Sequence, residues 1–136
     1  MGLLSTVYID LGNGLEHNET HMTSLDHMIF WENMKKAQDN GCTHMVVEVS
    51  SHALFQYRTR PLEFDGVGCT NISREHLDFH GTMEHYVRTK AELFSRAVPG
   101  ALAVLPSDFS YTSEFVNNKI SLHTFGHKNS SDIWVS

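Results

Sequence analysis

The sequence predicts an α/β fold, a mostly parallel sheet with flanking helices, from three observations. Short apolar and β-branched runs alternate with helix-length segments along the chain. The helical segments begin at capping residues and end near glycine or proline, as is typical of helices in βαβ units. The 136 residues, 40% of them hydrophobic, are enough for one domain with a buried core.

The N-terminal part is predicted to contain a strand followed by a polar connection. Leu3–Leu11 is largely apolar, and Asn13-Gly14 after it is a strong turn dipeptide. Glu16–Met22 is polar and shows no period, so we expect a loop or a short edge strand there. The sheet is therefore expected to begin with the first of these segments.

A helix and a second strand are predicted next. Thr23 or Ser24 can cap a helix that runs to about Asn40, and Gly41 supplies its C-terminal stop. Met45–Val49 is then a β-branched run typical of a strand buried on both faces. Because ligands of parallel sheets bind beyond the carboxyl ends of the strands, the residues that follow this run are candidates for a site.

The alternation continues in the second half of the chain. Asp65–Asn71 is predicted to be a strand, and Thr82 can cap a helix that reaches Ala97. Pro99-Gly100 is expected to interrupt the chain before a strand at Ala101–Leu105. A weaker helix at Ser110–Asn117 and a strand at Ile120–Phe125 complete the predicted elements.

Charge and composition exclude several classes of function. The formal net charge of −6 provides no basic field for nucleic acid or an anionic membrane. No apolar run approaches the roughly 18–20 residues of a membrane span, and the N-terminus lacks the features of a secretory signal. Cys42 and Cys69 lack the spacing of a zinc site or a disulfide framework. We therefore expect a cytoplasmic protein that binds neither nucleic acid nor membrane.

Polar and ionisable residues are concentrated after the predicted strand Met45–Val49, at residues 48–58. Glu48 is either an ordinary acid at the end of a strand or a metal ligand at the mouth of the sheet. Ser50, Ser51 and His52 could instead indicate a nucleophile and its base. However, they lack the G-x-S-x-G frame, and side chains that are neighbours in sequence rarely face each other, so a serine hydrolase is disfavoured.

The second dense strand end is at residues 70–81. His76 and His80 are four residues apart, which on one helical turn places both on one face. With Asp78 nearby, this set could suit zinc or another divalent cation, although the spacing alone also fits an exposed turn.

Lys90 is the third candidate. It shares a helical face with Tyr86, Leu93 and Phe94, so at least its stem is expected to be partly buried. Most such lysines extend their amine to solvent. Burial of a lysine amine favours its neutral, nucleophilic form, which is the precondition for covalent modification. The residues alone leave both readings open.

Taken together, these stretches resemble the central domain of the Mur ligases, and within that group the MurE-type tripeptide synthetases. The resemblance is carried by Met45–Leu54 (MVVEVSSHAL), Cys69–Tyr86 (CTNISREHLDFHGTMEHY) and Lys90–Phe94, and it runs from about Leu11 to Ala103. It implies a fold with an ATP-binding phosphate loop. It also implies an ATP- and magnesium-dependent reaction that joins an amino acid to UDP-N-acetylmuramoyl-L-Ala-D-Glu in peptidoglycan synthesis.

The resemblance also implies roles for individual residues. Lys90 matches the catalytic lysine that carbon dioxide carbamylates, and Glu48 and His76 match the other residues around the magnesium ion that the carbamate helps to hold. Asp78 and His80 match the motif too, and we expect them to have supporting or structural roles. The residues that match positions binding UDP-N-acetylmuramoyl-dipeptide are Thr23, Ser24, Ser50, Gln56 and Arg58.

The sequence also departs from the family pattern. No G-x-x-G-K-[ST] occurs in these 136 residues, so the loop that would hold the ATP phosphates is absent. We therefore expect residues 1–136 to be a partial central domain, without the uridine-binding and amino-acid-binding domains and inactive as it stands. In addition, Pro106-Ser107-Asp108-Phe109 stands where the family usually has Asn-x-Asp-Asp.

Two other readings remain open. The first is a degenerate, non-catalytic interaction module of the same fold, which the lost phosphate loop favours and the retained Glu48, His76 and Lys90 disfavour. The second is a small divalent-metal hydrolase that uses His76, Asp78 and His80. The third amino acid of the ligase reaction, diaminopimelate or lysine, is not encoded in these residues.

Overall fold

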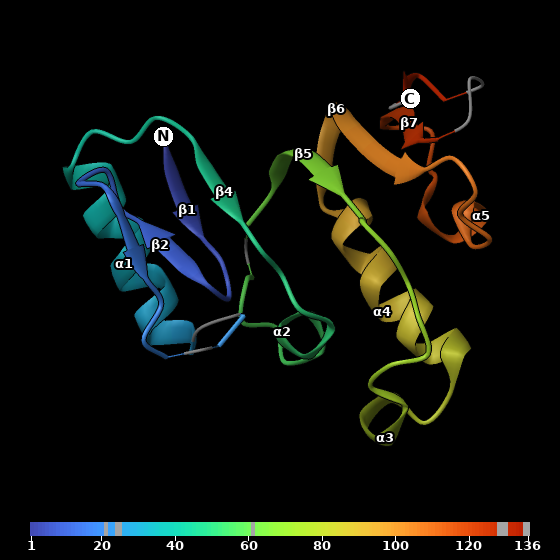
Figure 1. Ribbon diagram of the computed structural model, residues 1–136, viewed down its shortest axis with the longest axis horizontal. Helices are drawn as coiled ribbons and strands as arrows, with labels where there is room; N and C mark the ends of the chain where they lie inside the picture. The colour runs from blue at the N-terminus through green and yellow to red at the C-terminus, as the bar shows by residue number, and fades with distance from the viewer. Residues whose placement is uncertain (21, 24–25, 61, 128–130, 135–136) are drawn as a thin grey trace. The chain divides into compact units, whose positions relative to one another are not determined.

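The computed structural model describes residues 1–20, 22–23, 26–60, 62–127 and 131–134, and it shows two compact units, Met1–Arg60 and Pro61–Ser136 (Figure 1). Each unit has its own four-stranded sheet. The β1·β4, β5·β6, β6·β7 and β7·β8 pairs are parallel, and helices lie beside both sheets. The predicted α/β class with a mostly parallel sheet is therefore confirmed.

The sheet of the first unit has the order β3-β2-β1-β4. Its strands are β1 (Gly2–Leu4), β2 (Tyr8–Asp10), β3 (Leu15–His17) and β4 (Met45–Val47). β1, β2 and β3 form an antiparallel meander, whereas β4 pairs parallel to β1. Of the two alternatives for residues 16–22, the short edge strand is confirmed for its first two residues, because β3 is the outer strand of this sheet.

The prediction of one strand over Leu3–Leu11 is wrong, because the chain reverses between β1 and β2. Ser5 makes the reversal: its N–H donates to Tyr8 O at 3.0 Å, and its hydroxyl oxygen accepts from Tyr8 N–H at 3.1 Å. A serine hydroxyl can replace a backbone partner in this way, so an apolar run with one serine forms a hairpin rather than a continuous strand.

The helix α1 (His27–Asp39) lies beside this sheet (Figure 1) and buries Phe30, Asn33 and Ala37. Its N-cap is Asp26, whose carboxylate accepts from Met28 N–H at 3.1 Å, so the predicted cap at Thr23 or Ser24 is wrong. The predicted stop is confirmed, since Asn40 is the C-cap and Gly41 follows it with a φ of 82°.

The segment after α1 forms a shorter strand than predicted and then a helix. β4 ends at Val47, and Val46 is 53% exposed, so the prediction of a strand through Val49 buried on both faces is wrong. The chain leaves the strand because Ser50 caps the short helix α2 (Ser51–Phe55), its hydroxyl oxygen accepting from Ala53 N–H at 3.2 Å. Glu48 thereby lies just beyond the strand end.

The sheet of the second unit is parallel throughout and has the order β5-β6-β7-β8. Its strands are β5 (Phe64–Gly68), β6 (Ala97–Pro106), β7 (Ser121–Gly126) and β8 (Ile133–Trp134). β5 and β7 fall where strands are predicted, although β5 ends three residues early. β8 is not predicted, because a two-residue strand leaves no readable period.

β6 begins earlier than predicted and runs through Pro99-Gly100. The pairing with β5 is irregular there: Phe64 pairs with Ala97, whereas Gly66 pairs with Leu102. Gly100 takes a φ of 84° and donates its N–H to Lys119 O at 2.6 Å. A bulge of this kind accommodates a proline that cannot donate to the ladder, so the dipeptide distorts the strand without ending it.

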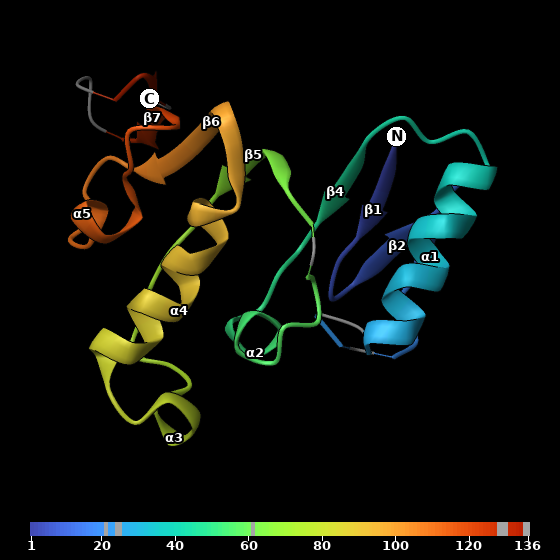
Figure 2. The same ribbon diagram turned by 180° about the vertical axis from the view of Figure 1, so that it is seen from behind.

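The described residues of the second unit also form the helices α3 (Leu77–His80), α4 (Met83–Ser95) and α5 (Thr112–Phe115). The predicted cap of α4 is confirmed, since the Thr82 hydroxyl oxygen accepts from His85 N–H at 3.2 Å. α3 lies at the N-terminal end of α4, as both views show (Figures 1 and 2). No helix in the described ranges is long and apolar enough to cross a bilayer. The core of this unit contains Val67, Cys69, Val87, Phe94, Ala97, Ala101, Ala103, Leu105 and Phe115.

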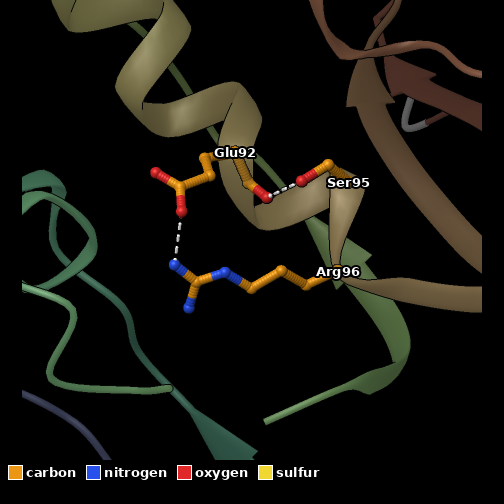
Figure 3. Close-up of polar contacts among 3 residues, drawn as sticks. All are labelled: Glu92, Ser95 and Arg96. Carbon is orange, nitrogen blue, oxygen red and sulfur yellow. Dashed lines mark hydrogen bonds and ion pairs between the residues drawn. The ribbon is translucent and has the colours of Figure 1, made fainter. Parts of the chain in front are cut away.

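Side-chain hydrogen bonds of Glu92, Ser95 and Arg96 stabilise the C-terminal end of α4 (Figure 3). Arg96 Nη2 lies 2.6 Å from Glu92 Oε1, one turn back, and the Ser95 hydroxyl donates to Glu92 O at 2.7 Å. A cation at a helix C-terminus also interacts favourably with the helix dipole. The helix consequently ends before Ala97, its predicted last residue, which instead begins β6.

Candidate active site

The first cluster of site residues lies at the carboxyl ends of the parallel strands β1 and β4. Glu48 directly follows β4 and donates its N–H to Leu4 O at 2.8 Å. Thr6, two residues beyond β1, donates to Glu48 Oε2 from its backbone N–H at 2.7 Å and from its hydroxyl at 2.9 Å. Two donors on one oxygen fix the orientation of the carboxylate, which is what a metal ligand requires.

Thr23 extends this cluster. Its hydroxyl oxygen lies 2.8 Å from that of Thr6. Each hydroxyl has a single proton, and the Glu48 carboxylate can only accept, so the geometry is satisfied when Thr23 donates to Thr6 and Thr6 donates to Glu48. Thr23 and Glu48 also line one small cavity of this unit together with Phe30 and Thr59. Ser24, the second residue of the predicted substrate pair, lies outside the described residues.

The other predicted substrate residues lie on α2 and the turn after it. Ser50 is the N-cap of α2 and Gln56 is its C-cap. Arg58 N–H donates to Ala53 O at 2.9 Å, and Arg58 O lies 3.0 Å from His27 Nδ1, which therefore carries the proton. These contacts fix the backbone of residues 50–58, so three predicted substrate residues are presented by one short segment.

In the second unit, Lys90 projects from α4 and is half-buried, as its apolar helical face predicts. Its Nζ donates to Asn71 O at 3.4 Å and lies 5.1 Å from the centroid of the Tyr86 ring. The ammonium group is thus held by a carbonyl oxygen and an aromatic face, both of which attract a positive charge. Lys90 therefore has a defined position near the end of β5, where Asn71 lies.

Cys69 shares the Asn71 carbonyl with Lys90. Its thiol donates to Asn71 O with a separation of 3.6 Å. Burial raises the pKa of the Cys69 thiol, and the positive charge of Lys90 acts against that rise, as does the bond to Asn71. The thiol therefore senses the charge on Lys90.

His76 is exposed and is the N-cap residue of α3, where its backbone is left-handed, with φ 56° and ψ 23°. This conformation is uncommon for residues other than glycine and often occurs at functional sites. The ring of His76 makes an edge contact with Tyr86, the centroids being 6.0 Å apart at an interplanar angle of 71°. Tyr86 therefore contacts both His76 and Lys90.

His76 is the left-handed N-cap residue of α3 and His80 is the last residue of that helix, with His80 N–H donating to His76 O at 2.9 Å. His80 is only 5% exposed, and its ring packs against Phe79, His85 and Tyr86. Among the described residues, no group of three or more His, Cys, Asp or Glu side chains could hold a metal ion.

The structure thus forms two sets of predicted residues, one in each unit. In the first set, Thr6 is hydrogen-bonded to both Glu48 and Thr23. In the second set, the Tyr86 ring contacts both His76 and Lys90. The oxygens of Glu48 and of a carbamate on Lys90 are donors that suit magnesium, whereas an imidazole such as that of His76 is a less usual ligand for this ion. The oxygen donors of each set, taken separately, are of a kind that suits magnesium, and the binding of an ion by these residues stays a prediction.

Sequence reasoning missed Thr6 and Tyr86. Thr6 was hidden because residues 3–11 read as one strand, and the signal that could have found it is the polar Ser5-Thr6 pair within that run. Tyr86 read as a core residue of a helix, although its spacing of four from Lys90 places the two on one face.

Comparison with known proteins identifies the class of this fold and site. The model of the Mur ligase middle domain matches residues 1–136, so the chain belongs to the Mur ligase family. The resemblance predicted from the sequence is confirmed.

Individual relatives indicate which Mur ligases this chain is similar to. A UDP-N-acetylmuramoyl-L-alanyl-D-glutamate–2,6-diaminopimelate ligase of Aquifex aeolicus is 40% identical over 94 residues, which are 69% of this chain and 19% of that protein. The ligase of the same name from Halalkalibacterium halodurans is 34% identical and covers 96% of this chain and 27% of its own length. A UDP-N-acetylmuramyl-tripeptide synthetase of Deinococcus radiodurans is 34% identical over 98% of this chain and 27% of its own length.

A solved structure gives the same result. A UDP-N-acetylmuramoyl-L-alanyl-D-glutamate–2,6-diaminopimelate ligase superposes with a TM-score of 0.73 at 25% identity, over 98% of this chain and 28% of that one. The chain therefore spans about a quarter of the length of this structure.

Proposed function

We propose that this chain is the middle-domain part of a ligase that adds the third amino acid to UDP-N-acetylmuramoyl-L-Ala-D-Glu during peptidoglycan synthesis. The observation that carries the proposal is the family match over residues 1–136 together with relatives named for this reaction. The two residue sets support it, because they contain the positions that the resemblance assigns to metal and substrate. ATP and the UDP-linked substrate place the reaction in the cytoplasm.

The reaction has two steps. A carboxylate oxygen of the D-Glu residue attacks the γ-phosphorus of ATP, ADP leaves, and an acyl phosphate forms. The amine of the incoming amino acid then attacks the acyl carbon, inorganic phosphate leaves with the bonding electrons, and the amine loses a proton as the amide forms. Both steps concentrate negative charge on phosphoryl oxygens, which cationic groups and metal ions stabilise.

Lys90 is the central residue of the proposal. Its ammonium group first loses a proton, and the neutral amine then adds to carbon dioxide, forming an N–C bond and releasing a second proton, so that a cation becomes an anion with two oxygens. By the resemblance, Glu48, which Thr6 orients, would offer a carboxylate oxygen to the magnesium ion, and His76 would offer an imidazole nitrogen. When bound to these groups, magnesium neutralises charge on the phosphoryl oxygens.

The dipeptide substrate is assigned to the first unit. The guanidinium of Arg58 can form a forked pair of hydrogen bonds with a carboxylate, and Thr23, Ser50 and Gln56 offer hydroxyl and amide groups to the same ligand. Ser24, like the others, belongs to this set by the resemblance.

A binding experiment tests the proposal on the 136-residue chain. UDP-N-acetylmuramoyl-L-Ala-D-Glu is titrated to millimolar concentration while backbone amide signals are followed by NMR, and UDP-N-acetylmuramoyl-L-Ala, which lacks the reacting carboxylate, serves as the matched ligand. We expect larger shifts at residues 50–58 and at Thr23 with the first ligand. Arg58→Lys should reduce that difference, whereas the exposed Arg88→Lys should keep it. Equal shifts with both ligands, or none, would contradict the substrate assignment.

A further inference from the structure

We propose that Tyr86 is a positioning residue that holds the side chains of Lys90 and His76 in the orientation the site uses. The inference rests on the proposed function for the roles of those two residues. It goes beyond that function in assigning a task to a buried aromatic residue, and every contact that supports it lies within the second unit.

The geometry places one ring at the centre of the second residue set. Tyr86 is 2% exposed and lies in the first turn of α4, its N–H donating to Thr82 O at 3.1 Å. The Lys90 amine lies over its ring at 5.1 Å, and the His76 ring meets it edge-on at 6.0 Å. The buried His80 ring also packs on it, with centroids 5.1 Å apart. A ring this deeply buried cannot turn freely, so it is a rigid support for both side chains.

The contact restricts Lys90 in particular. A lysine side chain has four rotatable bonds, and an exposed one samples many rotamers. Tyr86 precedes Lys90 by four residues on the same helix, so its ring lies directly beneath the lysine stem. Asn71 O holds the amine from another side at 3.4 Å. Together these two contacts select one position for the amine out of many.

The same ring directs the modified lysine. The face of an aromatic ring carries partial negative charge, which attracts the ammonium group and repels an anion. Once the amine has bonded to carbon dioxide and lost its proton, the two carbamate oxygens are anionic. They are therefore turned away from the Tyr86 ring, while the stem remains packed against it.

The backbone of His76 is held by its carbonyl oxygen, which accepts from Phe79 N–H at 3.1 Å and from His80 N–H at 2.9 Å, and its exposed ring contacts the Tyr86 ring. The residue adopts a left-handed conformation at the start of a four-residue helix, and a non-glycine residue in this region carries strain. The edge contact with Tyr86 gives its imidazole a packed neighbour. Loss of the ring should thus release both side chains together.

The test compares Tyr86→Leu with two other variants of the chain. Tyr86→Phe keeps the ring and should keep its effect. Phe115→Leu removes an equally buried ring, 1% exposed, from α5 and controls for the loss of core packing. The first readout is the ring-current shift of the Lys90 ε-methylene and His76 imidazole protons by NMR. The second is the carbamate signal of Lys90 in ¹³C-bicarbonate with magnesium chloride, and a thermal melt of each variant verifies folding.

We expect Tyr86→Leu to lose the ring-current shifts at both residues and to lower carbamate occupancy by about fivefold, the effect of one unfixed lysine side chain. Tyr86→Phe and Phe115→Leu should stay within about twofold of the parent, by the same measure. Parent-like shifts and carbamate in folded Tyr86→Leu, or an equal loss in Phe115→Leu, would overturn the inference. A parent chain that forms no carbamate contradicts the proposed function instead, and the ring-current shifts then decide whether Tyr86 holds the two side chains.

Discussion

Thr6 and Glu48, 42 positions apart in sequence, are joined by two hydrogen bonds to a single carboxylate oxygen. The contact exists because β1 and β4 are parallel neighbours, so the residues that follow them emerge at the same edge of the sheet. It gives Glu48 a fixed orientation before any ligand arrives. Such pre-organisation is what distinguishes a candidate metal ligand from an ordinary surface acid.

The first prediction concerns the hydroxyl of Thr6. Thr6→Val removes that donor and keeps the backbone N–H, so we expect the free energy of unfolding to fall by about 0.5–1 kcal/mol. Chemical denaturation measures the change. Thr6→Ser, which keeps the hydroxyl, should recover most of the loss, and a Thr6→Val protein as stable as the parent would show that the bond to Glu48 contributes nothing.

The second prediction uses Cys69 as a reporter of the charge on Lys90. Because burial raises the pKa of this thiol and Lys90 opposes the rise, Lys90→Met should raise the pKa further and slow alkylation of Cys69 near pH 8. A charge interaction near a protein surface corresponds to about a two- to fivefold change in rate. Iodoacetamide labelling followed by mass spectrometry measures it.

The exposed Lys35→Met is the matched control for this experiment and should leave the rate unchanged. The direction of the Cys69 pKa shift also determines how the free energy of unfolding depends on pH. The Cys69 thiol keeps its proton to higher pH in the folded protein than in the unfolded chain. Its contribution to the free energy of unfolding is therefore complete below the ordinary thiol pKa, and it is lost as the pH rises through the pKa of the folded protein. Faster labelling of Cys69 in Lys90→Met would contradict the assignment of Lys90 as the charge beside it.

The sequence predicted the fold class because the alternation of strands and helices is visible in the residue composition and in the spacing of the apolar residues. It located α4 through Thr82 and ended α1 at Gly41, since these signals act through the backbone of adjacent residues. It failed at two irregularities that an apolar run does not reveal: a turn made by hydrogen bonds between Ser5 and Tyr8, and a bulge whose Gly100 N–H donates to Lys119 O. The Ser5 turn splits one apolar run into two strands, and the bulge at Pro99-Gly100 lets β6 pass a dipeptide that ends most strands.

The sequence selected the polar residues of the candidate site, whose roles stay predictions, and it did not select the groups that contact them. Glu48, His76 and Lys90 carry recognisable chemistry, so motif and resemblance select them. Thr6 and Tyr86 are an ordinary threonine and an ordinary core tyrosine in sequence. The role of Thr6 arises from the order of the strands, and that of Tyr86 from contacts of its ring with Lys90 and His76. Their sequence signals, the Ser5-Thr6 pair and the spacing of four from Lys90, are too weak to assign these roles.

The third prediction concerns catalysis by the 136-residue chain alone. Its sequence contains no G-x-x-G-K-[ST] phosphate loop, and on this basis we predict that it does not hold a triphosphate. We expect neither ATP hydrolysis nor ligation when the purified chain is supplied with ATP, magnesium, the UDP-linked dipeptide and an amino acid. Release of phosphate above the no-enzyme background would show that ATP is held by residues outside the family pattern.

The last prediction concerns Lys90 in a full-length ligase that carries these residues. Lys90→Ala removes the group that becomes the carbamate, and it should abolish most activity. A small added carboxylic acid should restore part of that activity by supplying anionic oxygens in the vacated space. Lys90→Arg should not be rescued, because it keeps the positive charge and fills the same volume. Ligation rates with and without the added acid measure both effects.

The result that would reject the carbamate is equally specific. If Lys90→Ala kept kcat within about threefold of the parent, roughly 0.65 kcal/mol of barrier, the lysine would have no place in the chemistry. The contacts of its amine with Asn71 O and the Tyr86 ring would then serve folding alone. Rescue of Lys90→Ala but not of Lys90→Arg separates the two cases, because an added acid can replace a missing anion and cannot replace lost packing.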